Sequence, residues 1–212
     1  MKITHKGLDR FNRDLKKQCK KHKIKLSLIN TPNIPFVENT KIQVSGYFDS
    51  MNLELAVATD KDMKEWVEIL IHESCHLDQF VENCKVWASN SFFDVDSSSL
   101  LDLWLSNIIE LKPRILTKII NEIIDLERDC DKRAIQKIKK YKLTDIINIK
   151  EYTQKSNAYH LSYLAIKKLR KWNKTQKAPY QIPEVLESFS TVMAKENVLT
   201  NKQFQLLKKH CY

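Results

Sequence analysis

Two histidines and a glutamate near the middle of the chain have the types and the spacing that metal-assisted hydrolysis requires. His72 and His76 are four residues apart, and Glu73 follows the first histidine directly, giving an HExxH motif. Positions four apart on a helix share a face, so both imidazoles can reach one metal ion. Glu73 then lies beside them, where a carboxylate can take a proton from water. The plainer alternative is two surface histidines on an ordinary helix.

A catalytic zinc ion needs a third protein ligand, and a long helical segment later in the chain offers one. Glu127 and Asp131 fall on the apolar stripe of that segment, which is formed by Ile120, Ile123, Ile124, Cys130, Ala134, Ile135 and Ile138. Burying a carboxylate is costly unless a cation or hydrogen-bond donors meet it. We therefore expect Glu127 to ligate zinc and Asp131 to accept the free N–H of a ligating histidine, unless both pair with buried Arg or Lys.

The remaining charged residues of that segment are expected mainly on its outer face. They are Glu122, Asp125, Arg128, Asp129, Lys132, Arg133 and Lys137. A charged residue on a solvated face needs no partner, so this division is what singles out the two stripe carboxylates.

The elements that would position these residues follow from hydrophobic periodicity. A first amphipathic helix is expected over 7–22, and three β-forming segments at 23–29, 41–48 and 53–58 follow it. A helix from Thr59 or Asp60 to about residue 81 then carries HExxH. Further helices are expected at 100–111, 113–140, 151–172, 183–196 and 201–210, the last with Thr200 and Gln203 as a capping box. This order predicts an α+β fold in a single domain over 1–212, with an antiparallel sheet and a helical C-terminal lobe.

Composition narrows the classes of protein. Only two of the 212 residues are glycine, which disfavours nucleotide-binding folds built on Gly-rich loops. Five cysteines without CxxC spacing predict reduced thiols. The apolar runs are too short to cross a bilayer and no signal peptide is recognisable, so we expect a cytoplasmic protein without a membrane partner.

The charge balance leaves the partners open. A formal net charge of +10 permits binding to nucleic acid or to acidic protein surfaces. Much of the excess lies in two lysine-rich segments, around residues 16–25 and 137–142, which are also explained as solvated helix ends. Neither a nucleic-acid partner nor an oligomeric state follows from charge alone.

The two motifs together resemble a known family of enzymes. His72-Glu73-x-x-His76 followed by Glu127-x-x-x-Asp131 resembles the HExxH…ExxxD arrangement of the gluzincins, the thermolysin-like zinc peptidases. The order of helix, three strands and motif helix also resembles the minimal zincin core. About fifty residues separate His76 from Glu127, more than in thermolysin, so 83–112 is expected to be an insertion near the cleft.

A looser similarity extends over most of the chain. The run from Gly46-Tyr47-Phe48 through Leu126-Glu127-Arg128-Asp129-Cys130-Asp131 to Asn157-Ala158-Tyr159-His160 is similar to a group of bacteriophage-encoded metallopeptidases. If the chain is phage-encoded, the expected compartment is the cytoplasm of the host cell.

The resemblance implies an activity and further site residues. It implies hydrolysis of a protein or peptide substrate, with Zn²⁺ as cofactor and Glu73 as general base. In zincins the strand before the motif helix is an exposed edge, so 53–58 would pair with extended substrate, unless a loop covers it. Thermolysin-like enzymes stabilise the oxyanion with Tyr and His, which makes Tyr159 and His160 candidates; core packing is the alternative for Tyr159.

Two rival interpretations remain at this point. One is a basic, nucleic-acid-associated binding module in which the metal is structural or the active site vestigial, and a closed fourth coordination position would favour it. The other is a DNA-linked protease of the SprT-like kind, which shares the order of core elements. The third zinc ligand of that group is a histidine, and none is suitably placed in this sequence.

Overall fold

The structure is a computed structural model that describes residues 5–36, 43–92, 95–174 and 177–212. The chain forms two compact units: Met1–Cys84 with Arg133–Asn148, and Lys85–Lys132 with Ile149–Tyr212. Helix α5 (Pro113–Lys140) passes from the second unit into the first without interruption. The fold is α+β, as expected from the order of the elements, and the assignment of 1–212 to one domain stays a prediction.

The first unit contains a small mixed sheet. Strand β5 (Glu54–Ala58) lies in its middle, parallel to β1 (Lys25–Ile29) and antiparallel to β4 (Gly46–Asp49). A separate antiparallel pair consists of β2 (Ile34–Pro35) and β3 (Gln43–Val44). The predicted segment 41–48 is thus divided between β3 and β4, and its first two residues lie outside the described part of the chain.

Two expectations about this sheet were wrong. The sheet is not antiparallel throughout, because β1 and β5 run in the same direction and only β4 and β5 form a hairpin. The 53–58 segment is not an edge strand, because the backbone of β5 is hydrogen-bonded to a neighbour on each side. Residue alternation along a strand does not reveal which neighbours it has, so the strand order was not accessible from the sequence.

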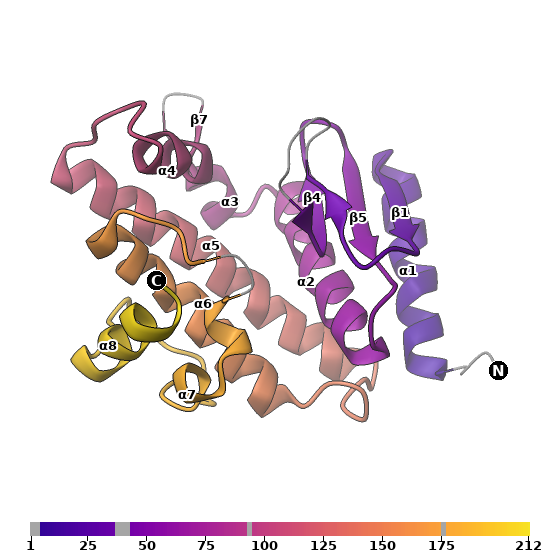
Figure 1. Cartoon of the computed structure of the whole chain (residues 1–212). Helices are drawn as coiled ribbons and strands as arrows, with labels where there is room; N and C mark the ends of the chain where they lie inside the picture. The colour runs from indigo at the N-terminus through magenta and orange to yellow at the C-terminus, as the bar shows by residue number, and fades with distance from the viewer. Residues whose placement is uncertain (1–4, 37–42, 93–94, 175–176) are drawn as a thin grey trace. The chain divides into compact units, whose positions relative to one another are not determined.

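Apolar residues explain how the helices of the first unit pack. Helix α1 (Lys6–His22) buries Leu8, Phe11, Leu15 and Cys19, as its periodicity predicted, and ends at Lys23 in the left-handed conformation. Helix α2 (Met63–Glu82) packs on β4 and β5, and Figure 1 shows α1 and α2 beside the sheet. At Gly46 a Cβ atom would lie 2.5 Å from the side chain of Ile69, so glycine is needed there for close approach.

Helix α2 is the element that presents the HExxH motif. Its N-cap position is Asp62 rather than the predicted Thr59 or Asp60. The helix ends at Glu82, and the N–H of the following Asn83 bonds to the carbonyls of Gln79 and Phe80. Its inward face buries Val67, Leu70, Ile71, Ser74, Cys75, Leu77 and Gln79. The three motif residues are half-buried beside that face, accessible enough to bind a ligand and constrained by the packing of their neighbours.

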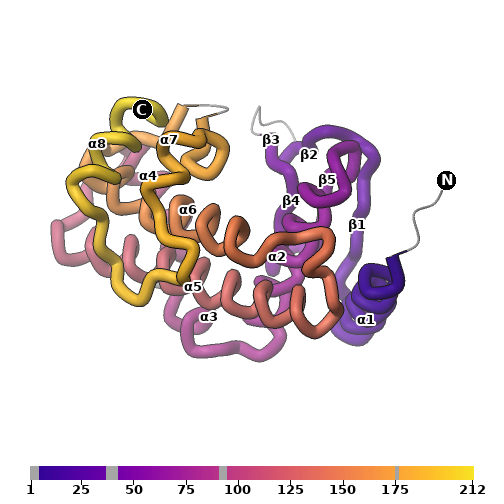
Figure 2. The backbone as a smooth tube through the Cα atoms, turned by 90° about the horizontal axis from the view of Figure 1, so that it is seen from below, coloured from indigo at the N-terminus to yellow at the C-terminus, as the bar shows by residue number. Residues whose placement is uncertain are grey.

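The second unit is mainly helical. Its longest helices, α5 and α6 (Ile149–Leu169), lie side by side (Figures 1 and 2). The shorter elements are α3 (Lys85–Ser89), β6 (Ser91–Phe92), β7 (Val95–Asp96), α4 (Ser97–Leu105), η1 (Pro179–Gln181), α7 (Pro183–Leu186) and α8 (Asn201–His210). Its core is centred on Ile119, Ile120, Ile123 and Ile124 of α5, with at most 1% of each exposed.

The predicted helices of this unit were correct where local signals set their ends. Helices 113–140 and 201–210 have the predicted bounds, and Thr200 and Gln203 form the expected capping box. The helix predicted at 100–111 instead covers Ser97–Leu105, with Asp96 as its cap. The helix predicted at 183–196 ends at Leu186, because Asn157 bonds to the carbonyls of Ser190 and Val192 and to the N–H of Ala194, which holds that stretch in another conformation.

Candidate metal centre

The two histidines of the motif converge on one point. Their Nε2 atoms are 3.2 Å apart, and the two rings are inclined by 83°. Two nitrogens that bind the same tetrahedral zinc ion, each at about 2.0–2.1 Å, are separated by about 3.3 Å. The spacing of His72 and His76 therefore fits a shared zinc ion.

Gln79 contacts the ring nitrogen of His76 opposite the one that faces His72. Its side-chain oxygen lies 2.9 Å from Nδ1 of His76, and the residue is fully buried. An amide oxygen can only accept, so the proton of a neutral His76 ring lies on Nδ1 and the Nε2 lone pair faces His72. Metal-binding histidines are commonly oriented by such a bond at the opposite ring nitrogen. Sequence reasoning missed Gln79, although its position one turn after His76 was a usable signal.

A second set of contacts, from α5 and α1, fixes the position of the motif helix. The ammonium of Lys137, on the C-terminal part of α5, lies 2.7 Å from a carboxylate oxygen of Asp78 and donates to the carbonyl of Ser74 over 3.0 Å. The other carboxylate oxygen of Asp78 accepts from Gln18 of α1 over 2.7 Å. Ser74 directly follows Glu73, so α5 contacts the turn of α2 that carries the predicted general base, and α1 and α5 both contact the next turn at Asp78.

In the second unit, Asp131 is a buried carboxylate that accepts hydrogen bonds. It is 3% exposed and accepts from Nε2 of His160 over 2.7 Å and from the hydroxyl of Tyr152. These bonds meet much of the desolvation cost that led us to expect a partner for Asp131. Its predicted bond to a ligating histidine stays a prediction.

The bond to Asp131 also limits what His160 can do. His160 is 1% exposed, and its Nδ1 has no hydrogen-bond partner among the described residues. A neutral ring that donates from Nε2 has no second N–H, so His160 would have to carry both protons to stabilise an oxyanion. Its predicted catalytic role stays a prediction.

Tyr159 keeps its proton in this environment. Burial raises the pKa of Tyr159 well above its ordinary value, and electrostatic interaction with Tyr163 and with the Glu127 carboxylate raises it further. The hydroxyls of Tyr159 and Tyr163 are 3.0 Å apart. Tyr159 therefore keeps its hydroxyl hydrogen through the neutral and mildly alkaline range, as an oxyanion donor must.

The expectation of a solvated outer face on α5 was wrong for several residues. Arg128 is 6% exposed and pairs with Asp125 over 2.9 Å and with the side chain of Asn197. Glu122 accepts from the Ser97 hydroxyl over 2.8 Å, and Lys137 faces α2. The helix is packed on more than one side, so a charged residue off the apolar stripe can still be enclosed, provided that it is paired.

One group of candidate ligands among the described residues could hold a metal ion: His72, His76 and Cys130. Sequence reasoning placed Cys130 on the apolar stripe of α5, one turn after Glu127, but did not consider it as a metal ligand. Cys130 is fully buried, and Glu127 is half-buried. Glu127 does not belong to that group, so its role as third ligand stays a prediction.

No protein-family model, curated protein or solved structure matches this chain. The resemblance to gluzincins and phage metallopeptidases accordingly stays an expectation. Among the residues described, no helix has both the length and the apolar character that crossing a membrane requires.

Proposed function

We propose that this chain is a zinc-dependent peptidase whose metal is held by His72, His76 and a third ligand from α5. The convergence of the two Nε2 atoms, with the amide oxygen of Gln79 at Nδ1 of His76, is the observation that supports the proposal. Glu127 is the predicted third ligand, and the thiol of Cys130 is the alternative. Two imidazoles with one carboxylate or thiolate match known catalytic zinc sites, which leave a fourth position open.

The protein residues divide the chemistry between them. Zinc in such a site polarises a carbonyl group and lowers the pKa of a water molecule. Glu73, next to His72 on α2, accepts the proton of the attacking water and delivers it to the leaving amine. Tyr159 donates a hydrogen bond from its hydroxyl to the oxyanion that develops on the attacked carbonyl. No covalent intermediate with the protein is required, and the substrate is a protein or peptide.

The decisive experiment combines metal analysis with hydrolysis of an unfolded protein substrate. The wild-type chain should bind about one zinc ion. Glu73→Gln should keep that ion and lose hydrolysis, since an amide preserves the shape of the side chain but cannot take a proton. The His72→Ala, His76→Ala double variant should lose both metal and activity. Glu65→Gln, an exposed position on the same helix, serves as the control.

Each outcome bears on a separate part of the proposal. Full zinc occupancy in the double histidine variant would remove the metal centre. Substantial activity in Glu73→Gln would mean that another group is the base. A wild-type protein that binds zinc and hydrolyses nothing would favour the binding-module interpretation.

A further inference from the structure

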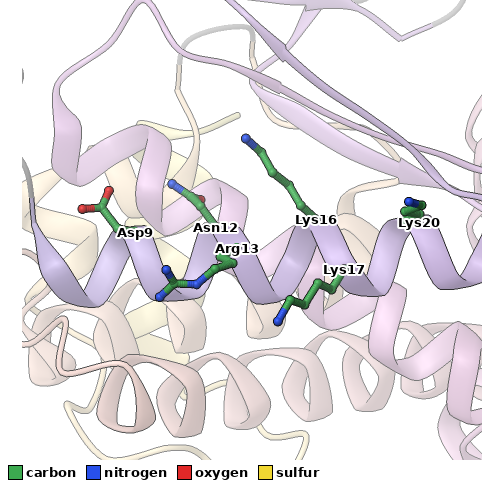
Figure 3. A pocket seen from close by; sticks show the side chains of 6 residues that line it. All are labelled: Asp9, Asn12, Arg13, Lys16, Lys17 and Lys20. Atoms are coloured by element: carbon green, nitrogen blue, oxygen red, sulfur yellow. The ribbon is translucent and has the colours of Figure 1, made fainter.

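The solvent-facing side of α1 carries a row of cations that the proposed peptidase chemistry does not use. Its members, here called the α1 basic face, are Arg13, Lys16, Lys17 and Lys20. All four are exposed and line an open hollow along the helix, together with Asp9 and Asn12 at its N-terminal end (Figure 3). They point away from the side of α1 that enters the core.

The α1 basic face carries more positive charge than its surroundings neutralise. None of its four cations forms an ion pair within the described ranges of the chain, and the acidic residue in the hollow, Asp9, lies at one end. Elsewhere in the same unit, Lys25 is paired with Glu54 at 2.8 Å and Lys137 with Asp78 at 2.7 Å. Four like charges on successive turns of one helix face repel one another, and an external polyanion would relieve that cost.

We propose that the α1 basic face binds the phosphate backbone of nucleic acid. From Arg13 to Lys20 the helix rises by about 10 Å, at 1.5 Å per residue. A duplex carries about one phosphate charge per 1.7 Å of axis, so several phosphates fall within reach of these side chains. Contacts of this kind hold nucleic acid without reading its sequence.

The composition of this face favours nucleic acid over a protein or a membrane. Protein interfaces are enriched in aromatic residues and depleted in lysine, and the face contains three lysines, an arginine and no apolar side chain. A membrane-surface helix inserts its apolar side into the lipid. In α1 that side is already committed to the core, with Leu8, Phe11, Leu15 and Cys19 between 2% and 6% exposed.

The test measures binding of the full chain to a labelled 20-base-pair DNA duplex between 50 and 200 mM KCl. The logarithm of the wild-type association constant should fall against the logarithm of salt concentration, with a slope of about −0.9 for each phosphate contacted. The variant Arg13→Gln, Lys16→Gln, Lys17→Gln, Lys20→Gln should lose roughly three to four units of that slope and at least about tenfold in affinity at 50 mM. Its circular dichroism should be unchanged, because the four side chains are exposed.

A matched control removes the same charge elsewhere. The variant Lys195→Gln, Lys202→Gln, Lys208→Gln, Lys209→Gln alters four exposed lysines of the second unit and should retain most of the affinity and slope. Equal losses in the two variants would overturn the proposal, since net charge alone would then be responsible. So would an absence of binding to duplex DNA, single-stranded DNA and duplex RNA alike, or binding confined to vesicles containing phosphatidylserine.

This inference stands apart from the proposed peptidase activity. The four residues lie on α1, and the proposed catalytic residues lie on α2, α5 and α6. The quadruple variant should therefore hydrolyse a short peptide as fast as the wild-type chain. A protein that binds nucleic acid and hydrolyses nothing would keep this inference and remove the proposed function.

Discussion

At the scale of single residues, the buried side chain of Gln79 orients the ring of His76 on α2. The glutamine is fully buried, and its amide oxygen lies at 2.9 Å from the histidine Nδ1. A metal needs a lone pair on the opposite nitrogen, so the bond selects the tautomer that can bind. The same contact restricts the rotation of the ring.

We predict that Gln79→Leu lowers zinc affinity by about 10- to 100-fold, the usual effect of removing a partner of a ligating histidine. Gln79→Glu keeps an acceptor at the same distance and should lose less. A competing chelator measures both affinities, and Gln205→Leu on the exposed side of α8 is the control. Unchanged affinity in Gln79→Leu would show that the orientation of His76 has another source.

At the scale of elements, the proposed third ligand of the metal comes from α5. We predict that Glu127→Ala loses zinc affinity by orders of magnitude, while Asp129→Ala changes it little. Cys130→Ala should also retain the metal if Glu127 is the ligand. Cobalt substitution gives an independent measurement, because a thiolate ligand adds a sulfur-to-metal charge-transfer absorption. That absorption in the wild type, together with loss of metal in Cys130→Ala, would transfer the role from Glu127 to Cys130.

The contact between α2 and the end of α5 yields a prediction about stability. The side chains of Asp78 and Lys137 are only 17% and 15% exposed, and Gln18 also donates to Asp78. Asp78→Ala should lower the free energy of unfolding in urea by about 1–3 kcal/mol, since it leaves an enclosed ammonium without its carboxylate. Glu82→Ala removes the more exposed pair with Arg133 and should cost less than about 1 kcal/mol. Similar losses in the two variants would contradict this difference.

Helix ends set by nearby residues were predictable from the sequence, whereas the partners of strands and side chains that come from distant segments were not. Pro113 and the Thr200–Gln203 capping box are signals within a few residues of the helix ends that they set, and those ends were correct. The pairing of β5 with β1 depends on a segment almost thirty residues earlier, and the end of α7 depends on Asn157. In the site, HExxH was visible at once, whereas the partners of Asp131 came from a helix that no spacing rule connects to it.

At the scale of the whole molecule, buried acids limit alkaline stability. Burial raises the pKa of the Cys19 and Cys211 thiols to about 11, from an ordinary value of 9.0. Between pH 9 and 11 the unfolded chain therefore loses these protons while the folded chain keeps them, so stability falls as pH rises. Burial also raises the pKa of Tyr163 and Tyr212, which extends the fall above pH 10.

We predict that Cys19→Ala reduces this alkaline loss by about 1–3 kcal/mol, each variant being referred to its own stability at pH 7. Urea unfolding at pH 7, 9, 10 and 11 provides the measurement. Cys84→Ala, at a half-buried thiol, should follow the wild-type curve. An identical pH dependence in Cys19→Ala would mean that the thiol of Cys19 does not titrate differently in the two states.

The interrupted first unit has a consequence for how the protein is made. A growing chain exposes Met1–Cys84 first, but Arg133–Asn148 belongs to the same unit and is synthesised only after the intervening segment. Until then Ser74 lacks its hydrogen bond from Lys137 and Asp78 lacks its ion pair with Lys137, so α2 is not yet held by α5. The contacts of α5 to the helix that carries the proposed general base therefore form only after α5 has been synthesised, which would delay the proposed peptidase activity until then.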